Sequence, residues 1–394
     1  MRLRFSGIVT VPVRNEVVSN NGASGTSGAG LAPSSAAPTR EGASSGWSRT
    51  PQAPQSPRAR GTEQRGRSAY AALDLGTNNC RLLIAEPVHF GFRVIDAFSR
   101  IVRLGEGLGS GDRLTDGAIR RTLDALRVCR TKMETRGVAR ARLIATEACR
   151  LAANGPAFIG RVRDELGLNL EIVDRRTEAY LAVTGCAALA DPRAQSVIVF
   201  DIGGGSTEVA WLDGPAPNAA ADPCKRIRAW DSMPVGVVTL AERHGGVEVT
   251  PQTFEWMVEE VSDRLAKFAV VAGPAAAAPH FHLLGTSGTV TTVGGVHLRL
   301  PRYDRRRVDG LWMAHDEVSA VIERLLQTQF DQRAANPCIG RDRADLVLAG
   351  CAILEAIRRA FPAERLRIAD RGLREGILTN LMREDGVLRR KGRG

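Results

Sequence analysis

The sequence predicts an α/β protein built from two related domains that face one another across a cleft. Two observations carry this prediction. Apolar runs typical of strands alternate with helical periods through residues 69–386. A short pattern, in which an apolar strand leads into an aspartate and a glycine-rich turn, also occurs twice, with Asp74 and Asp201 at equivalent positions. This repeat indicates two copies of one folding unit.

The first unit, residues 69–190, is expected to begin with three strands. A helix follows, because Ile119, Leu123 and Leu126 recur at helical spacing, while Thr115 can cap its start and Gly137 can end it. A strand at 141–146, a helix over 155–166, a strand at 170–173 and a helix from residue 176 come next. Three successive strands followed by alternating strands and helices are the order of a ribonuclease-H-like unit.

The second unit, residues 191–386, repeats this order. Its strands are expected at 197–201, 208–213, 226–232, 280–286 and 365–370. One helix begins at Thr250, which caps it, with Pro251 in the first turn. Further helices are expected near 315–327, 342–360 and from residue 372. The division between the units is predicted near residue 190.

Residues 1–68 and 387–394 are predicted to be basic tails. The first is rich in Ser, Gly, Ala and Pro, a composition that buries too little surface to order itself, so we expect it to be disordered. Most of the net charge of +11 lies in these tails, which favours weak attraction to polyanions and no specific nucleic-acid binding. No apolar run approaches the roughly 18 residues of a membrane span. Seven scattered cysteines fit a reducing cytoplasm and indicate no zinc site.

The glycine-rich turns are the main candidates for a ligand site. Three consecutive glycines exceed what a hairpin needs, which favours a nest of backbone N–H groups for phosphate over an ordinary turn with positive φ. A third glycine-rich turn, at 283–295, again follows an apolar strand. The predicted phosphate-binding residues are Gly76, Thr77, Asn78 and Arg81 in the first loop, Gly203, Gly204, Gly205, Ser206 and Thr207 in the second, and Gly285 and Ser287 in the third.

Together these motifs resemble the exopolyphosphatase and guanosine pentaphosphate phosphohydrolase family, within the actin, sugar-kinase and heat-shock ATPase superfamily. The resemblance covers residues 69–386 and is carried by LDLGTNNCRLLIA, IATEACRLAANG, EIVDRRTEAYLAVTG, VFDIGGGSTEVAWL, MPVGVVTLAE, LLGTSGTVTTVGG and DRGLREGIL, in family order. One departure is Asp309, where the family often has His.

The resemblance implies a cytoplasmic phosphoanhydride hydrolase that releases orthophosphate processively from the end of inorganic polyphosphate. Guanosine pentaphosphate is the alternative substrate, and a homodimer is one possible assembly. The resemblance makes Glu147 the general base, although its residue context also fits a first-turn helix glutamate. Asp74, Asp201 and Glu178 are the expected acids for Mg²⁺ or Mn²⁺, and Glu178 is a second catalytic candidate. Two other hypotheses are a kinase of the same superfamily and a non-catalytic polyphosphate or alarmone sensor.

Overall fold

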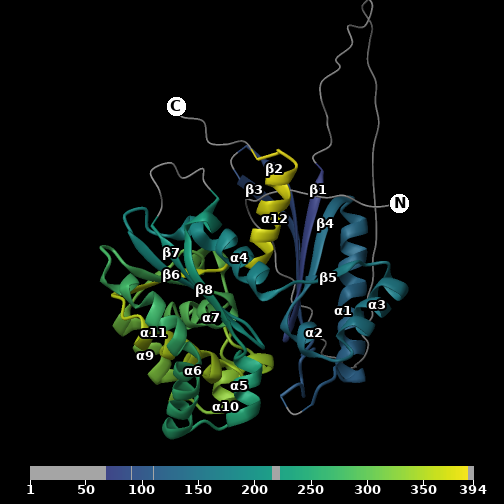
Figure 1. The fold of residues 1–394 in the computed structure, drawn as a ribbon. Coiled ribbons are helices and arrows are strands. Elements are labelled where there is room, and N and C mark those ends of the chain that lie inside the picture. The colour runs from purple at the N-terminus through teal and green to yellow at the C-terminus, as the bar shows by residue number, and fades with distance from the viewer. Residues whose placement is uncertain (1–67, 90, 110, 215–221, 389–394) are drawn as a thin grey trace, which may run out of the picture. The chain divides into compact units, whose positions relative to one another are not determined.

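A computed structural model describes residues 68–89, 91–109, 111–214 and 222–388 (Figure 1). The predictions for residues 1–67 and 389–394 lie outside these ranges. Within them, no helix is long and apolar enough to cross a membrane.

The first half of the described chain forms a five-stranded sheet in the order β3-β2-β1-β4-β5. Neighbours β1, β2 and β3 pair antiparallel, whereas β4 runs parallel to both β1 and β5. The strands are β1 (Ala69–Leu75), β2 (Asn79–Val88), β3 (Gly91–Ile101), β4 (Val138–Ala145) and β5 (Leu170–Ile172). Its first helices are α1 (Asp116–Thr135), α2 (Glu147–Leu151) and α3 (Gly155–Leu166).

The second half forms a six-stranded sheet in the order β10-β11-β9-β6-β7-β8. Apart from the edge strand β10, it repeats the first sheet, because β6, β7 and β8 pair antiparallel while β9 runs parallel to β6 and β11. The strands are β6 (Ser196–Ile202), β7 (Thr207–Asp213), β8 (Ile227–Met233), β9 (His282–Thr286), β10 (Trp312–Ala314) and β11 (Arg365–Ala369). The predicted fold class, with two related α/β units, is confirmed.

Seven helices of the described second half surround this sheet and share a buried apolar core with it. The expected α6, α9 and α11 are present, whereas α5, α8 and α10 were not predicted. The stretch after β9 was predicted as a turn and is instead a helix. The seven are α5 (Val237–His244), α6 (Pro251–Ala272), α7 (Ser287–His297), α8 (Arg305–Val308), α9 (His315–Leu326), α10 (Phe330–Ala335) and α11 (Val347–Ala360).

The last helix of each half packs against the sheet of the other half. Val183 and Cys186 of α4 (Arg175–Cys186) pack with β6 and β7. Conversely, Ile377, Leu378 and Met382 of α12 (Leu373–Glu384) belong to the core of the first sheet. Figure 1 shows α12 beside α4 and the first sheet. The division near residue 190 stays a prediction, because the packing crosses it in both directions.

The two exchanged helices cross at glycines. A side chain on Gly185 of α4 would overlap the backbone of Gly372, and one on Gly376 of α12 would overlap the backbone of Leu181. Glycine is therefore required here because the two backbones approach one another directly.

Candidate active site

The two predicted phosphate loops have the same internal hydrogen bonds. The Gly76 amide donates to the Asn79 carbonyl, and the Gly203 amide donates to the Ser206 carbonyl, both at 2.9 Å. In each loop the following carbonyls accept amides from a segment farther along the chain. These bonds correct the prediction for Gly76 and Gly203, because their N–H groups close the hairpin turns and are not available to phosphate.

The glycines of the second loop let it touch the first loop. Neither Gly204 nor Gly205 has positive φ. A Cβ on Gly204 would lie 3.0 Å from the Thr77 Cβ and 3.1 Å from the Asn78 nitrogen. A Cβ on Gly205 would lie 2.6 Å from the Thr77 hydroxyl oxygen and 3.3 Å from the Glu147 Cγ. The glycine run is therefore required by close approach of the loops, not by chain reversal.

Several loop amides remain candidate phosphate donors. Within the described ranges, the N–H groups of Thr77, Asn78, Gly204 and Gly205 donate to no protein acceptor. The side-chain oxygens of Asn78 and Asn79 are also buried without a hydrogen-bond partner. Buried polar groups are rarely left unpaired, so this region is built for a further ligand or for water.

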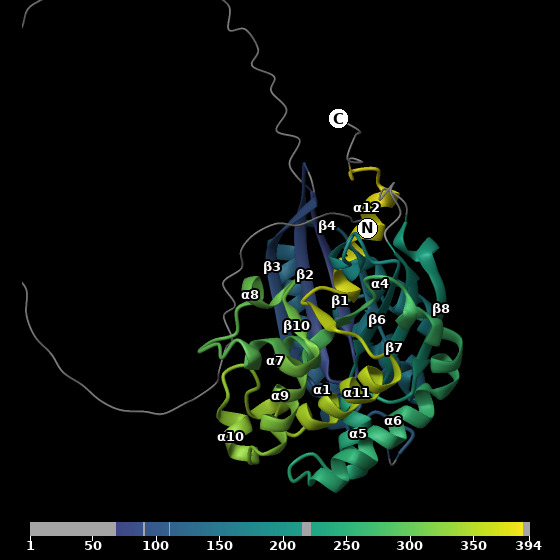
Figure 2. The ribbon, with the colours of Figure 1, turned by 90° about the vertical axis from the view of Figure 1, so that its left-hand side faces the viewer.

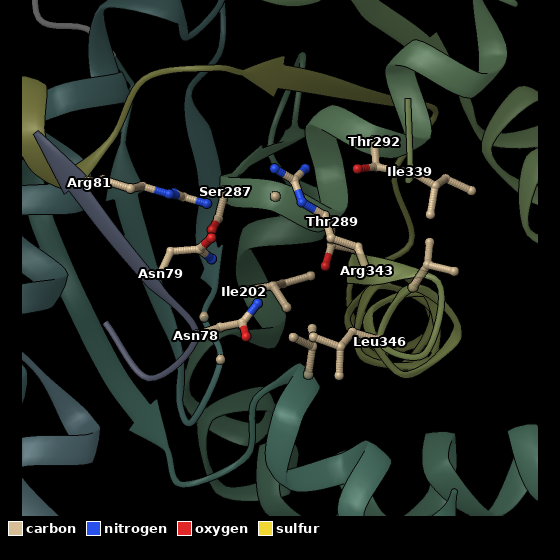
Figure 3. Close-up of a pocket in the computed structure, with 15 residues that line it drawn as sticks. Asn78, Asn79, Arg81, Ile202, Ser287, Thr289, Thr292, Ile339, Arg343 and Leu346 are labelled. Carbon is tan, nitrogen blue, oxygen red and sulfur yellow. The ribbon is translucent and has the colours of Figure 1, made fainter. Parts of the chain in front are cut away.

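A pocket opens beside the contact between the two loops (Figure 3). Arg81 reaches toward Ser287 from β2, while Arg343 lies across the pocket on the second half. The first turn of α7 forms one wall, and its unsatisfied N–H groups favour an anion. Ser287 has a φ of 80°, which is strained for a residue with a side chain. Predicted residues in the lining are Asn78, Arg81, Gly203, Gly204 and Ser287, and residues not predicted include Asn79, Gly288, Thr289 and Arg343.

Three predicted phosphate ligands have packing roles instead. Gly285 lies within β9, where a Cβ would meet the Phe200 ring. The Thr207 hydroxyl is fully buried and donates to the Val235 carbonyl at 2.7 Å. Ser206 is also buried, and its side chain hydrogen-bonds to Glu208. None of the three lines the pocket.

Four acids near the two loops have raised pKa values, and Glu178 and Glu208 are buried while Asp74 and Asp201 are half-buried. Burial raises the pKa of Asp74. The pKa of Asp201 rises to about 6 because of burial and the charge of Asp74. The pKa of Glu178 rises to about 7 through burial and the charges of Asp74 and Asp201, against the opposing effect of Arg150. Glu208, which the sequence did not suggest, has a pKa well above its usual value through burial and the charges of Glu178 and Asp201.

This acid cluster fits a divalent cation held partly through water. Among the described residues, no three His, Cys, Asp or Glu side chains are grouped so that they could hold a metal ion by themselves. The predicted acids Asp74, Asp201 and Glu178 therefore do not form a complete protein cage. Mg²⁺ usually takes one or two carboxylates together with water and substrate phosphates. A cation there would also relieve the repulsion among these acids.

The two predicted catalytic glutamates are joined by one arginine. Arg150 donates to Glu147 through Nε at 2.9 Å and to Glu178 through Nη2 at 2.9 Å. Glu147 also accepts from Arg175 at 2.6 Å, so both of its carboxylate oxygens are occupied by guanidinium groups. Glu178 lies in the first turn of α4, and among the described residues its one ion-pair partner is Arg150.

Comparison with known proteins identifies the family. The Ppx/GppA phosphatase family matches residues 83–385. The chain belongs to this family. It is 26% identical to a putative exopolyphosphatase of Haemophilus influenzae, over 79% of this chain and 90% of that protein. It is 28% identical to exopolyphosphatase 2 of Mycobacterium tuberculosis, over 79% of this chain and 98% of that protein.

Solved structures agree with this assignment. An exopolyphosphatase from Cytophaga hutchinsonii has a TM-score of 0.72 at 22% identity, covering 81% of this chain and 98% of that one. The Ppx/GppA protein of Aquifex aeolicus has a TM-score of 0.66 at 25% identity, covering 81% and 99%. This Ppx/GppA member is therefore a phosphoanhydride hydrolase with the actin-like two-domain fold.

The structure also shows the surroundings of two further residues of this Ppx/GppA member, Arg374 and Asp309. Arg374 interacts electrostatically with both Asp74 and Asp201, yet no ion pair or hydrogen bond of its guanidinium is found in the described ranges. Burial lowers the pKa of Arg374, and the charges of Arg81 and Arg305 lower it further. The DRGLREGIL motif contained Arg374, but no local signal showed that it faces the acids. Asp309 forms an ion pair with Arg371 and fixes this turn.

Proposed function

We propose that this chain is an exopolyphosphatase that releases orthophosphate processively from the end of inorganic polyphosphate, with Mg²⁺ as its metal. The observation that carries the proposal is the contact of the two loops beside a pocket lined by Arg81 and Arg343 and a cluster of acids with raised pKa values. Phosphoryl transfer needs phosphates to be positioned, their charge neutralised and a water molecule oriented. The names of the curated relatives support polyphosphate as the substrate class. A cytoplasmic location and a homodimer stay predictions.

The pocket supplies the groups that would position the phosphates. Arg81 and Arg343 would donate charge-assisted hydrogen bonds from opposite halves of the protein. The amides of Gly204 and of the first turn of α7 would add donors from the backbone. Because these groups come from both halves, substrate would hold the two halves together.

Asp74 and Asp201 are the residues that would hold Mg²⁺, through water molecules and the phosphates of the substrate. When bound there, the cation supplies neutralisation of the negative charge on the phosphates. Arg81 and Arg374 lie near the same two carboxylates and would bind phosphate oxygens that the cation leaves free.

The general base would be one of the two glutamates that Arg150 joins. The resemblance assigned this role to Glu147, but that carboxylate already accepts from Arg150 and Arg175. Glu178 faces Asp74 and Asp201 and keeps one carboxylate oxygen free of arginine. We therefore favour Glu178 as the acceptor of the water proton, with Glu147 holding Arg150 in place. A pKa near 7 would also suit Glu178 for this task.

Guanosine pentaphosphate is the alternative substrate, because its 5′ end presents the same terminal phosphoanhydride. The test is orthophosphate release from polyphosphate, guanosine pentaphosphate and ATP, with and without Mg²⁺. We expect release from polyphosphate that depends on Mg²⁺ and is faster than from ATP. A preference for guanosine pentaphosphate would select the alternative, and absence of release from every substrate while polyphosphate binds would favour the sensor hypothesis.

A further inference from the structure

We propose that exposed arginines beside α8 bind the part of a polyphosphate chain that extends beyond the phosphates held in the pocket. This inference rests on the proposed function. The arginine rim consists of Arg299, Arg302, Arg306 and Arg307, all of them exposed. Asp304 is the one acid in this segment, and it accepts a hydrogen bond from the Arg306 amide at the start of α8.

Two part-buried contacts connect the arginine rim to the start of α12. Arg305 lies between Arg306 and Asp304 in the chain but points inward, donating to Glu375 at 2.7 Å. The Tyr303 hydroxyl donates to Asp370 at 2.6 Å. Asp370 belongs to the turn that leads into α12, and Glu375 belongs to the first turn of that helix, so these contacts tie the rim to the start of α12.

The segment 370–375, which includes the start of α12, also contacts the acid cluster. The Thr286 hydroxyl donates to the Arg371 carbonyl at 2.7 Å. A Cβ on Gly372 would lie 3.0 Å from that hydroxyl oxygen and 3.8 Å from a carboxylate oxygen of Asp201. One turn of chain therefore separates the arginine rim from Asp201. Figure 2 shows α8 close to α7, whose first turn lines the pocket.

The charges along this path favour a long polyanion. Arg374 interacts electrostatically with Arg81 on the pocket side and with Arg305 on the rim side, while Glu375 offsets part of the charge of Arg305 and Arg374. Within the described ranges, no acid pairs with the Arg306 or Arg307 guanidinium, whereas Arg127, Arg130 and Arg161 on α1 and α3 are all paired. The neighbouring positive charges of Arg306 and Arg307 repel one another, and a chain of phosphates would relieve this repulsion.

This arrangement predicts different behaviour for short and long substrates. A short substrate such as tripolyphosphate would be held in the pocket and would not reach the arginine rim. A long chain carries charge along its whole length, so its affinity would include the rim and would fall as salt is added. The rim would therefore set chain-length preference without affecting the chemical step.

The experiment compares the full-length R306A/R307A variant with wild type and with R161A/R163A. The control removes the same charge from exposed positions on α3. Equilibrium binding of long-chain polyphosphate and of tripolyphosphate is measured across a salt series, beside orthophosphate release from each. We expect the rim variant to bind the long chain about five- to tenfold more weakly, with a salt slope smaller by about 2, and to bind and cleave tripolyphosphate like wild type.

Two results would overturn the inference. One is a long-chain affinity and salt slope in R306A/R307A equal to those of R161A/R163A. The other is an equal loss for tripolyphosphate, which would place the effect in the pocket. If wild type binds long polyphosphate but releases no orthophosphate, the proposed function fails, and the binding comparison still decides the role of the arginine rim.

Discussion

Replacing Glu178 by Gln tests the identity of the general base. The substitution keeps the shape of the side chain and its contact with Arg150 while removing the carboxylate that would accept a proton. General-base catalysis typically contributes about 10²–10⁴-fold, so kcat for orthophosphate release should fall within that range. Steady-state release from polyphosphate at saturating Mg²⁺ measures this, and a binding assay should show an unchanged or tighter complex.

Although E178Q should lower kcat, it should not lower the stability of the metal-free protein, and the size of this effect follows from the pKa of Glu178. The folded-state pKa of Glu178 is raised from 4.5 to about 7, so the fold prefers the protonated form. The contribution of Glu178 to metal-free stability is therefore most favourable below pH 4.5 and is lost as the pH rises through 7. At about 1.4 kcal/mol per pKa unit, the ionised carboxylate costs at most about 3 kcal/mol above pH 7. In metal-free buffer at pH 8, E178Q should melt at a temperature equal to or above that of wild type.

Glu147→Gln is the matched control, because it removes the other carboxylate bound to Arg150. Glu147 is buried between two arginines, so removing its charge should cost about 3 kcal/mol, the lower end for a buried pair since Arg175 is 39% exposed. At roughly 2–4 °C per kcal/mol, its Tm should fall by about 6–12 °C. A folded E147Q variant with kcat reduced more than a hundredfold, beside an active E178Q, would refute our reasoning and restore the original prediction of Glu147.

Three further predictions concern the loops, the pocket and the metal. Gly204→Ala places a Cβ about 3.0 Å from the Thr77 Cβ, so it should force the loops apart and lower kcat/KM at least tenfold, while the free energy of unfolding falls by about 1–3 kcal/mol. A wild-type kcat/KM would show that the loops need not touch. Arg343→Ala should raise KM for polyphosphate about tenfold with little change in kcat, as expected for loss of one charged hydrogen bond; an unchanged KM in initial-rate assays would remove Arg343 from the substrate site. Mg²⁺ should raise the Tm of wild type more at pH 8 than at pH 5, because Asp201 and Glu178 have pKa values of about 6 and 7 and are protonated at the lower pH. Asp201→Asn should reduce the gain in Tm at pH 8. An equal gain in both proteins, measured by thermal shift, would exclude Asp201 from the metal site.

Local patterns predicted much of the fold. The strands leading into both glycine loops and the helix α3 lie where the apolar spacing placed them. The helix α7 was missed for a physical reason. Its sequence is rich in Gly, Thr and Val, which have low helix propensity, and nearly every residue after its first turn is buried. Tertiary packing, which a local pattern does not contain, therefore decides its conformation.

The candidate site was predictable only where a single segment carries the signal. Glycine-rich loops and their aspartates stand out locally, so Asp74, Asp201 and Arg81 could be named. Arg343 and Glu208 could not, because their roles depend on contacts between distant segments. The same limit applied to Glu147: Arg150 lies three residues away on α2, but the second partner, Arg175, became visible only when α4 was brought beside α2.

Glycines fix the two places where the halves of the protein meet most closely. At one, Gly204 and Gly205 touch the first loop; at the other, Gly185 and Gly376 let α4 and α12 cross. Glu178 lies two turns before Gly185 on the same helix, so the crossing sets the position of this carboxylate relative to the acids of both sheets. A side chain at Gly376 would push the helices apart and displace Glu178 without touching substrate. The duplicated fold thus couples the position of Glu178, the proposed general base, to the contact between its two halves.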